Sequence, residues 1–212
     1  MSAPPPAPRR RRSPEEARAE ALEAARRLLL EDGPEAVTLK AVAGEIGMSH
    51  ANLLHHFGSA EGLQTTLMAQ MVHDLSGAIR ETVAQVRAGQ ALPRDIVVRV
   101  FDAFDSGGAG RLAAWLALLG DLDRLAPIRA AVDELVEALV REVPDDDDLR
   151  GRIREVVLFV TLMAFGDAVI GAQIREMLGL DADAGRQIGY RLLPVVIGPR
   201  PETATVNTDE IR

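Results

Sequence analysis

Three of the four histidines of this 212-residue chain, His50, His55 and His56, lie within one short segment. Clustered imidazoles could bind a metal ion, act as catalytic bases or donate hydrogen bonds to an anion. His50 and His55 are five residues apart, so they do not share one face of a helix. The nearest carboxylates, Glu45 and Glu61, lie across expected turns, and the chain has no cysteine. We therefore expect no metal site, no cofactor and no Ser-His-Asp catalytic arrangement.

The residues around these histidines have the pattern of two short helices joined by a tight turn. Thr38 is a suitable N-cap for a helix over 38–45, and Gly47 can adopt the left-handed conformation of a turn. Ser49 can cap a second helix that runs through His55. This pattern predicts a helix-turn-helix, in which the second helix enters the major groove of DNA while the first crosses the backbone.

Charge is distributed unevenly along the chain, whose formal net charge is −8. Residues 1–58 carry 8 basic and 8 acidic side chains, whereas residues 59–212 carry 16 basic and 24 acidic ones. The net acidity argues against a general nucleic-acid binder. Only the N-terminal part could approach a polyanion at modest electrostatic cost. Arg9–Arg12 could reach a DNA backbone or could be part of a solvated tail.

Helix-forming residues dominate the sequence and β-branched runs are scarce, which predicts an all-α fold. Beyond the helix-turn-helix, helical patterns extend over 14–31, 59–88, 93–106, 110–120, 127–143, 148–178 and 182–197. Four parts are expected along the chain. They are a disordered basic arm (1–13), a three-helix helix-turn-helix DNA-binding domain (14–58), a larger helical effector-binding and dimerisation domain (59–198) and a disordered tail (199–212).

Several protein classes are excluded by what the sequence lacks. Without cysteine there is no disulfide and no thiolate chemistry. The basic N-terminus is not followed by an apolar segment, so it is not a secretory signal. The longest apolar stretch, 156–165, is about half of a membrane span. We expect a cytoplasmic protein that has no membrane partner and is not an enzyme.

The expected helix over 148–178 is apolar nearly all round between Val156 and Ile174. Such a helix must be buried on more than one side. The last helix, with Ile188, Leu192 and Val195, offers a second apolar face. Two helices from each of two subunits would form a four-helix interface, so we expect a homodimer.

Residues 15–65 resemble the DNA-binding domain of the tetracycline-repressor (TetR) family of regulators. The segment that carries the resemblance is DGPEAVTLKAVAGEIGMSHANLLHHFGSAEGL. The positions that match the family pattern in order and spacing are Thr38, Val42, Ala43, Gly47, Met48, Ser49, Leu53, His56, Phe57, Ser59, Glu61 and Leu63. Leu54 and Ala60 stand where the family has Tyr and Lys, which commonly contact phosphate. Their loss implies weaker sequence-independent affinity, for which Arg9–Arg12 could compensate.

The resemblance implies roles for eight residues at a double-stranded DNA operator. Ser49, His50 and Asn52 would reach base edges, and an asparagine can pair with adenine through two hydrogen bonds. His55, His56 and Lys40 would contact phosphate, while Thr38 and Ser59 would present helix N-termini to it. Simpler roles stay open for some of them: His56 could serve packing beside Phe57, Lys40 could be a solvated lysine, and Thr38 and Ser59 could be caps alone.

The resemblance also implies a ligand-responsive repressor that acts as a homodimer on a palindromic operator. The larger domain would bind a small-molecule effector. Its candidate lining residues are Phe101, Phe104, Trp115, Met163 and Asp167, although each of the apolar ones could be plain core. Asp167, a lone carboxylate in an apolar stretch, could meet a ligand, an arginine or the subunit interface. Two alternatives remain, a DNA-binding regulator without an effector and a helical protein-interaction module. The second leaves the pattern over 38–63 unexplained.

Overall fold

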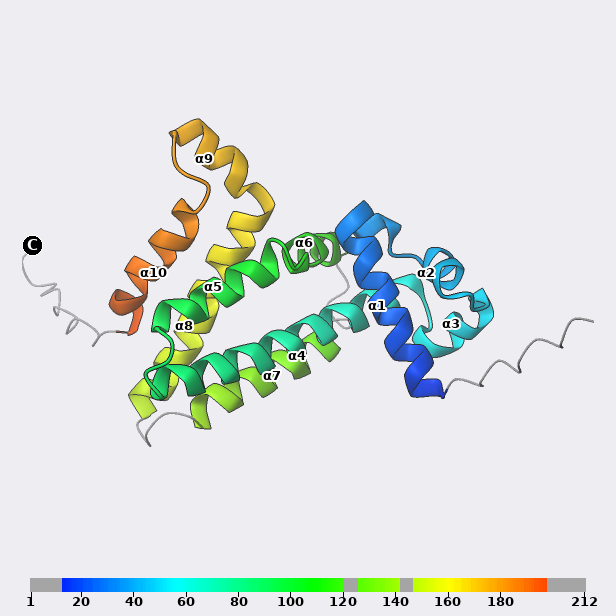
Figure 1. Cartoon of the computed structure of the whole chain (residues 1–212), viewed down its shortest axis with the longest axis horizontal. Helices are drawn as coiled ribbons and strands as arrows, with labels where there is room; N and C mark the ends of the chain where they lie inside the picture. Colours follow the sequence, from blue (N-terminus) through cyan, green and yellow to red (C-terminus); the bar gives the residue numbers. More distant parts are fainter. Residues whose placement is uncertain (1–12, 120–125, 142–146, 198–212) are drawn as a thin grey trace, which may run out of the picture. The chain divides into compact units, whose positions relative to one another are not determined.

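The computed structural model describes residues 13–119, 126–141 and 147–197, and every regular element in these ranges is a helix (Figure 1). The all-α expectation is confirmed. The predicted disorder of the N-terminal arm and the C-terminal tail concerns residues 1–12 and 198–212, which lie outside the described residues. Ser13, assigned to the arm from sequence, is the N-cap of the first helix.

The helices follow one another with short connections. Their bounds are α1 (Pro14–Asp32), α2 (Leu39–Ile46), α3 (His50–Phe57), α4 (Ala60–Arg87), α5 (Pro93–Phe104), α6 (Ala109–Leu119), α7 (Ala126–Arg141), α8 (Asp147–Gly166), α9 (Ala172–Leu178) and α10 (Ala184–Ile197). A short 3₁₀ turn, η1 (Pro34–Ala36), lies between α1 and α2, and a π-helical segment, η3 (Asp167–Gly171), joins α8 to α9. The sequence predicted one continuous helix over 148–178 and missed this π-helical segment.

The chain divides into two compact units. The first unit holds the residues up to 75 together with 103–132, and the second holds 76–102 and the residues from 133 onward. The boundary that the sequence places between residues 58 and 59 therefore lies inside the first unit. The division falls within α4 and α7 and near the end of α5, so these helices contribute to both units.

The core of the first unit joins α1, α2 and α3 to the start of α4 and to α6. Leu29, Leu53, Leu63 and Leu112 in this core are almost completely buried. Gly108, just before α6, has a φ of +81° and lies so close to α1 that a Cβ there would be 3.0 Å from Leu30 Cδ2. Burial of apolar surface thus makes α6 part of the same folded unit as the helix-turn-helix.

In the second unit, α10 packs against α8 (Figure 1). The Asp167 carboxylate, in η3, forms a shielded ion pair with Arg175 of α9. A Cβ on either Gly171 or Gly185 would collide with Asp167, so these two glycines leave the space that the carboxylate occupies. A second ion pair joins α10 to α5, because Arg186 lies 2.7 Å from Asp102.

One side of α8, η3 and α9 carries large apolar side chains that are exposed. They include Leu158 and Leu162, each 59% exposed, and Ile170, which is 53% exposed. The helical stretch Gly151–Leu178 is long and apolar enough to cross a membrane by length and composition alone. The sequence had indicated a shorter apolar stretch. Only 17% of the most apolar part of this helix is buried within the chain itself.

Candidate nucleic-acid interface

The turn between α2 and α3 is fixed by two side-chain caps and one glycine. Thr38 Oγ1 accepts a hydrogen bond from the Ala41 backbone N–H at 3.1 Å, and Ser49 Oγ accepts one from the Asn52 N–H at 3.2 Å. Gly47, with φ +65° and ψ +33°, takes the left-handed conformation that ends α2. These local contacts place the start of α3 directly after the turn, as the sequence predicts.

The eight-residue helix α3 has one buried side and one exposed side. Leu53 and Phe57 are buried in the core, whereas Ser49, His50 and Asn52 are exposed around its N-terminus. His55 is exposed further along the same helix. The residues predicted to reach base edges are therefore brought together at one accessible end, which is the geometry that major-groove reading requires.

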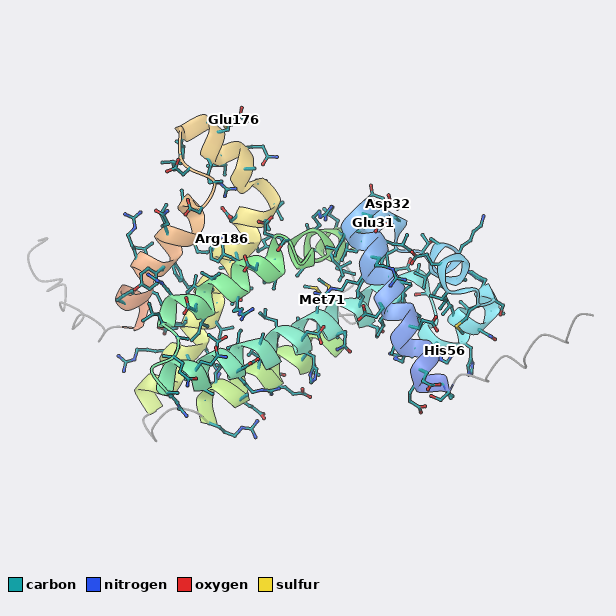
Figure 2. The ribbon with its side chains drawn as sticks, in the orientation of Figure 1. Glu31, Asp32, His56, Met71, Glu176 and Arg186 are labelled. Carbon is teal, nitrogen blue, oxygen red and sulfur yellow. The ribbon has the colours of Figure 1, made fainter. Side chains whose placement is uncertain are left out.

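The C-terminal end of α3 is held by α1. Arg18 Nη1 donates a hydrogen bond to the His56 backbone carbonyl oxygen at 2.9 Å, and the Arg18 guanidinium lies 4.8 Å from the centroid of the Phe57 ring. His56 is half-buried beside the first turns of α1 (Figure 2). Its imidazole centroid lies 6.3 Å from that of Phe57. This packing agrees with the simpler role considered for His56 and leaves its imidazole part-exposed.

The passage from α3 into α4 is fixed by a left-handed glycine, a side-chain cap and a close backbone contact. Gly58 has a φ of +74°, and its N–H donates to the Leu54 carbonyl oxygen at 2.8 Å. Ser59 Oγ caps α4 by accepting a hydrogen bond from the Gly62 N–H at 3.0 Å. A Cβ on Gly62 would collide with the Phe57 carbonyl oxygen. The caps on Thr38, Ser49 and Ser59 are thus observed, and their contact with phosphate remains a prediction.

The charge on this surface comes from few groups. Lys40 on α2 is exposed, and α3 contains three histidines but neither lysine nor arginine. On α1, hydrogen bonds from the backbone and from the Ser13 side chain lower the pKa of the exposed Glu15 carboxyl. Arg9–Arg12 lie outside the described residues. The phosphate contacts expected of the described helices would fall to Lys40, the histidines and the helix N-termini.

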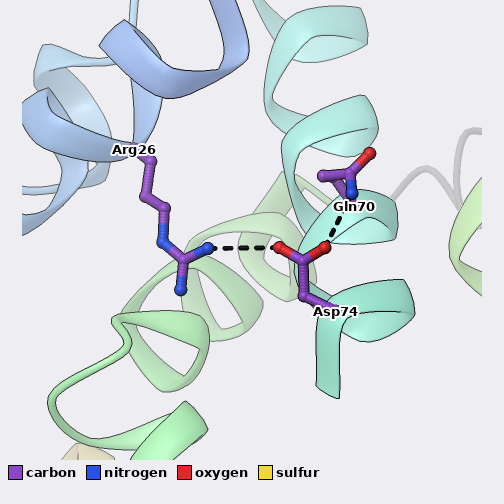
Figure 3. A network of polar contacts seen from close by, with 3 residues as sticks. All are labelled: Arg26, Gln70 and Asp74. Atoms are coloured by element: carbon purple, nitrogen blue, oxygen red, sulfur yellow. Dashed lines mark hydrogen bonds and ion pairs between the residues drawn. The ribbon is translucent and has the colours of Figure 1, made fainter. Parts of the chain in front are cut away.

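All three arginines of α1 contact other elements. Arg26 pairs with Asp74 of α4 at 3.3 Å, and Asp74 also accepts a hydrogen bond from Gln70 at 2.8 Å (Figure 3). Arg27 pairs with Glu45 of α2 at 3.4 Å, while Arg18 reaches α3. Arg18 is not among the residues that the sequence predicts to contact DNA. It is 38 residues from its partner, and no short-range pattern indicates such a contact.

The five residues predicted to line an effector site occur in both units. Phe104 and Trp115 belong to the first unit, whereas Phe101, Met163 and Asp167 belong to the second. Phe101 is buried, and its ring lies near α10, where a Cβ on Gly189 would be 3.4 Å away. Asp167 is paired with Arg175. Ligand binding by these residues remains a prediction.

Within residues 13–119, 126–141 and 147–197, no group of three or more His, Cys, Asp or Glu side chains could hold a metal ion. The three clustered histidines do not converge, because His55 and His56 are sequence neighbours with tilted rings 5.9 Å apart and His50 lies at the other end of α3. Imidazoles placed in this way could instead form separate hydrogen bonds to a ligand that lies along α3.

Known proteins share both sequence and fold with this chain. Residues 21–64 match the model of the family described as bacterial regulatory proteins, tetR family. The chain is similar to the transcriptional regulator BetI of Rhizobium meliloti, with 32% identity over 51% of this chain and 53% of that protein. It is also similar to the transcriptional repressor KstR2 of Rhodococcus jostii, with 32% identity over 42% of this chain and 44% of that protein. The matches thus span about half the length of these curated relatives.

The likeness of fold extends over most of the chain. The crystal structure of the multidrug-binding protein EbrR in complex with ethidium superposes with a TM-score of 0.59. It covers 84% of this chain and 98% of that one at 18% identity. At this level of identity the similarity concerns the fold, which includes the helices that follow the helix-turn-helix.

Proposed function

Because this chain belongs to the tetR family of bacterial regulatory proteins through its residues 21–64, we propose that it is a transcriptional repressor. It would bind a palindromic operator as a homodimer and respond to a small-molecule effector. The observation that carries the proposal is the capped, exposed N-terminus of α3, where Ser49, His50 and Asn52 lie together. Asn52 would read adenine, and His50 and Ser49 would donate to neighbouring base edges.

The phosphate contacts would surround this reading end. Lys40 on α2 and His55 and His56 on α3 would donate to backbone oxygens, and the N-termini of α2 and α4 would favour phosphate through the positive ends of their helix dipoles. Domain roles follow the predicted boundaries, with DNA reading in 14–58 and effector binding and dimerisation in 59–198. The acidic remainder of the chain would be repelled by phosphate, so it would have to point away from the DNA.

The proposed dimer rests on the exposed apolar side of α8, η3 and α9 and on its neighbour α10. Contiguous apolar patches of this kind on a soluble protein mark an interaction site. A second copy covers the patch with a matching one, because a two-fold interface joins identical surfaces. The same cover keeps the long apolar helix out of a membrane, and the proposed location is the cytoplasm.

The proposed effector would bind in the larger helical domain. EbrR binds ethidium within the same fold. In the present chain Trp115 lies on α6, the helix that shares the core of the helix-turn-helix. A ligand that shifts α6 would alter the first unit directly, provided that it binds the two arrangements with unequal affinity. Trp115 is the only tryptophan, so its fluorescence during titration with ethidium tests whether this part of the chain accepts a ligand.

The DNA-reading role is tested by fluorescence anisotropy with the duplex that lies upstream of the protein's own coding region. Measurements over a salt series with excess competitor DNA separate specific from electrostatic binding. We expect saturable binding that survives the competitor and weakens about tenfold or more in His50→Ala with Asn52→Ala. His73→Ala, which removes the exposed histidine of α4, is the matched control and should bind like the wild type. Equal affinity of the double variant and the wild type would contradict the assignment of α3.

A further inference from the structure

We propose that Arg18 is the positioning residue of the DNA-reading helix. Its guanidinium is turned onto the last turn of α3, and it sets the orientation of that helix without contacting phosphate. The inference rests on the proposed DNA-reading function and adds a residue to it. It comes from the first unit alone, in which α1 and α3 both lie.

One guanidinium contacts two consecutive residues of α3. Arg18 Nη1 donates to the His56 carbonyl oxygen at 2.9 Å, and Arg18 Cζ lies 4.8 Å from the Phe57 ring centroid. A planar guanidinium can stack on an aromatic face and donate at its edge at the same time. The two contacts act in different directions, so together they restrict both translation and rotation of the helix end.

The helix α3 depends on such contacts. It has only eight residues, and an isolated helix of that length is not stable in water. Two of its side chains, Leu53 and Phe57, are buried, and they lie four residues apart on one side. Because these two buried side chains lie on one line along the helix, they restrain rotation of α3 about that line only weakly. Arg18 supplies a third contact next to Phe57, from a different helix.

The carbonyl that Arg18 reaches also requires a partner. The last backbone carbonyl groups of a helix receive no hydrogen bond from an N–H of the same helix. They also form the negative end of the helix dipole. At the end of α3, the Gly58 N–H donates a hydrogen bond to the Leu54 carbonyl oxygen, and the Arg18 guanidinium donates one to the His56 carbonyl oxygen. A cation at this position both satisfies the oxygen and matches the helix dipole.

The other arginines of α1 do not share this role. Arg26 pairs with Asp74 of α4, and Arg27 pairs with Glu45 of α2. Arg18 is therefore the arginine of α1 that reaches the reading helix. Arg27 provides the matched control, since it lies on the same helix and its ion pair with Glu45 is exposed.

A positioning role and a phosphate-binding role predict different effects of replacing arginine by lysine. Lysine keeps the positive charge, so a phosphate contact would survive the change Arg18→Lys. Lysine cannot lie flat on Phe57 while donating to His56. If Arg18 positions α3, specific affinity falls, whereas binding to unrelated DNA and its salt dependence stay the same.

The experiment uses the full chain and a duplex that the wild-type protein enriches from a random-sequence pool. If the protein enriches no sequence, that result counts against the proposed function. In that case Arg18 has no sequence-specific DNA binding to maintain. With an enriched duplex in hand, affinities are measured for it and for an unrelated duplex of equal length over a salt series. Arg18→Lys and Arg18→Met should both lose about five- to twentyfold on the enriched duplex. Neither should change on the unrelated one, and Arg27→Lys should match the wild type on both.

Two results would overturn the inference. One is unchanged specific affinity in Arg18→Lys together with a salt slope that falls by about one in Arg18→Met, which identifies a phosphate contact. The other comes from amide hydrogen exchange of the free protein, which needs no DNA. Both variants should speed exchange at residues 54–58 while α1 keeps its protection. Exchange at 54–58 as slow as in the wild type would show that Arg18 does not hold this end of α3.

Discussion

The guanidinium of Arg111 in α6 donates a hydrogen bond to the backbone carbonyl oxygen of Leu30, 3.3 Å away in the last turn of α1. The same turn of α1 packs against Gly108, which immediately precedes α6. Ala109, Leu112 and Leu116 of α6 are buried in the core that also contains the helix-turn-helix. The folded unit that carries α3 therefore includes a helix from much later in the sequence.

Truncation of Leu112 tests this shared core. Leu112 is fully buried, so Leu112→Ala should lower the free energy of unfolding by about 2–5 kcal/mol. It should also speed amide exchange in α1, α2 and α3, because they depend on the same core. Leu118→Ala on the same helix removes a side chain that is 84% exposed and should change stability by less than about 0.5 kcal/mol. Unchanged exchange over 14–58 in Leu112→Ala would show that these residues fold without α6.

Gly62 tests the close contact between α3 and α4. A Cβ at this position would collide with the Phe57 carbonyl oxygen, so Gly62→Ala must displace the end of α3 or the start of α4. We expect a loss of about 1–3 kcal/mol in urea unfolding. Gly44→Ala is the matched control, because a Cβ on that α2 residue meets no described atom within 4 Å. It should stabilise the protein by up to about 1 kcal/mol through helix propensity. Equal effects of the two changes would mean that the contact at Phe57 relaxes freely.

Local signals explain why much of the fold is predictable from the sequence. Thr38, Ser49 and Ser59 cap the helices that their positions indicate, and Gly47 forms the turn. These features act over three or four residues, so the sequence contains them directly. The end of α3 was placed two residues early, at His55, because Phe57 continues the helix through its packing in the core.

Features that depend on long-range contacts were not predictable in the same way. The contact of Arg18 with α3 joins residues 38 apart, and the placement of α6 in the first core joins residues still further apart. The π-helical segment at Asp167 is a local irregularity, but the pairing of Asp167 with Arg175 and its fit between Gly171 and Gly185 depend on how α10 packs. From sequence, Asp167 could have met a ligand, an arginine or a partner subunit. The structure pairs it with an arginine.

The Asp167–Arg175 ion pair should contribute to the stability of the second unit. Both side chains are shielded, with 14% and 17% of their surface exposed, so removal of one charge leaves the other poorly solvated. We expect Asp167→Asn or Arg175→Met to cost about 1–3 kcal/mol in urea unfolding, and the double variant to cost less than the sum. Asp102→Asn, at the more exposed pair with Arg186, should cost about 1 kcal/mol or less. Strict additivity at Asp167 and Arg175 would show that the pair is not coupled.

The apolar side of the second unit leads to a prediction about assembly. Leu158, Leu162 and Ile170 are more than half exposed and recur at helical spacing along α8 and η3, and Leu192 on α10 is 42% exposed. A monomer in water would leave this surface uncovered, whereas a two-fold dimer would bury it against the same residues of a second copy. The wild-type protein should sediment as a dimer at micromolar concentration.

A single charge at the centre of this surface should separate the subunits. Leu162→Glu would bury a carboxylate without a partner at the interface and should shift the protein to monomer, as measured by sedimentation equilibrium. Leu118→Glu introduces the same charge at an exposed site on α6 and should leave the dimer intact.

A wild-type monomer at high concentration would contradict the dimer. The apolar helix Gly151–Leu178 would then need another cover, and co-sedimentation with lipid vesicles would test whether that cover is a membrane. If Leu162→Glu is monomeric and retains its helical content, its affinity for an enriched palindromic duplex should fall steeply, because one subunit alone contacts one half-site.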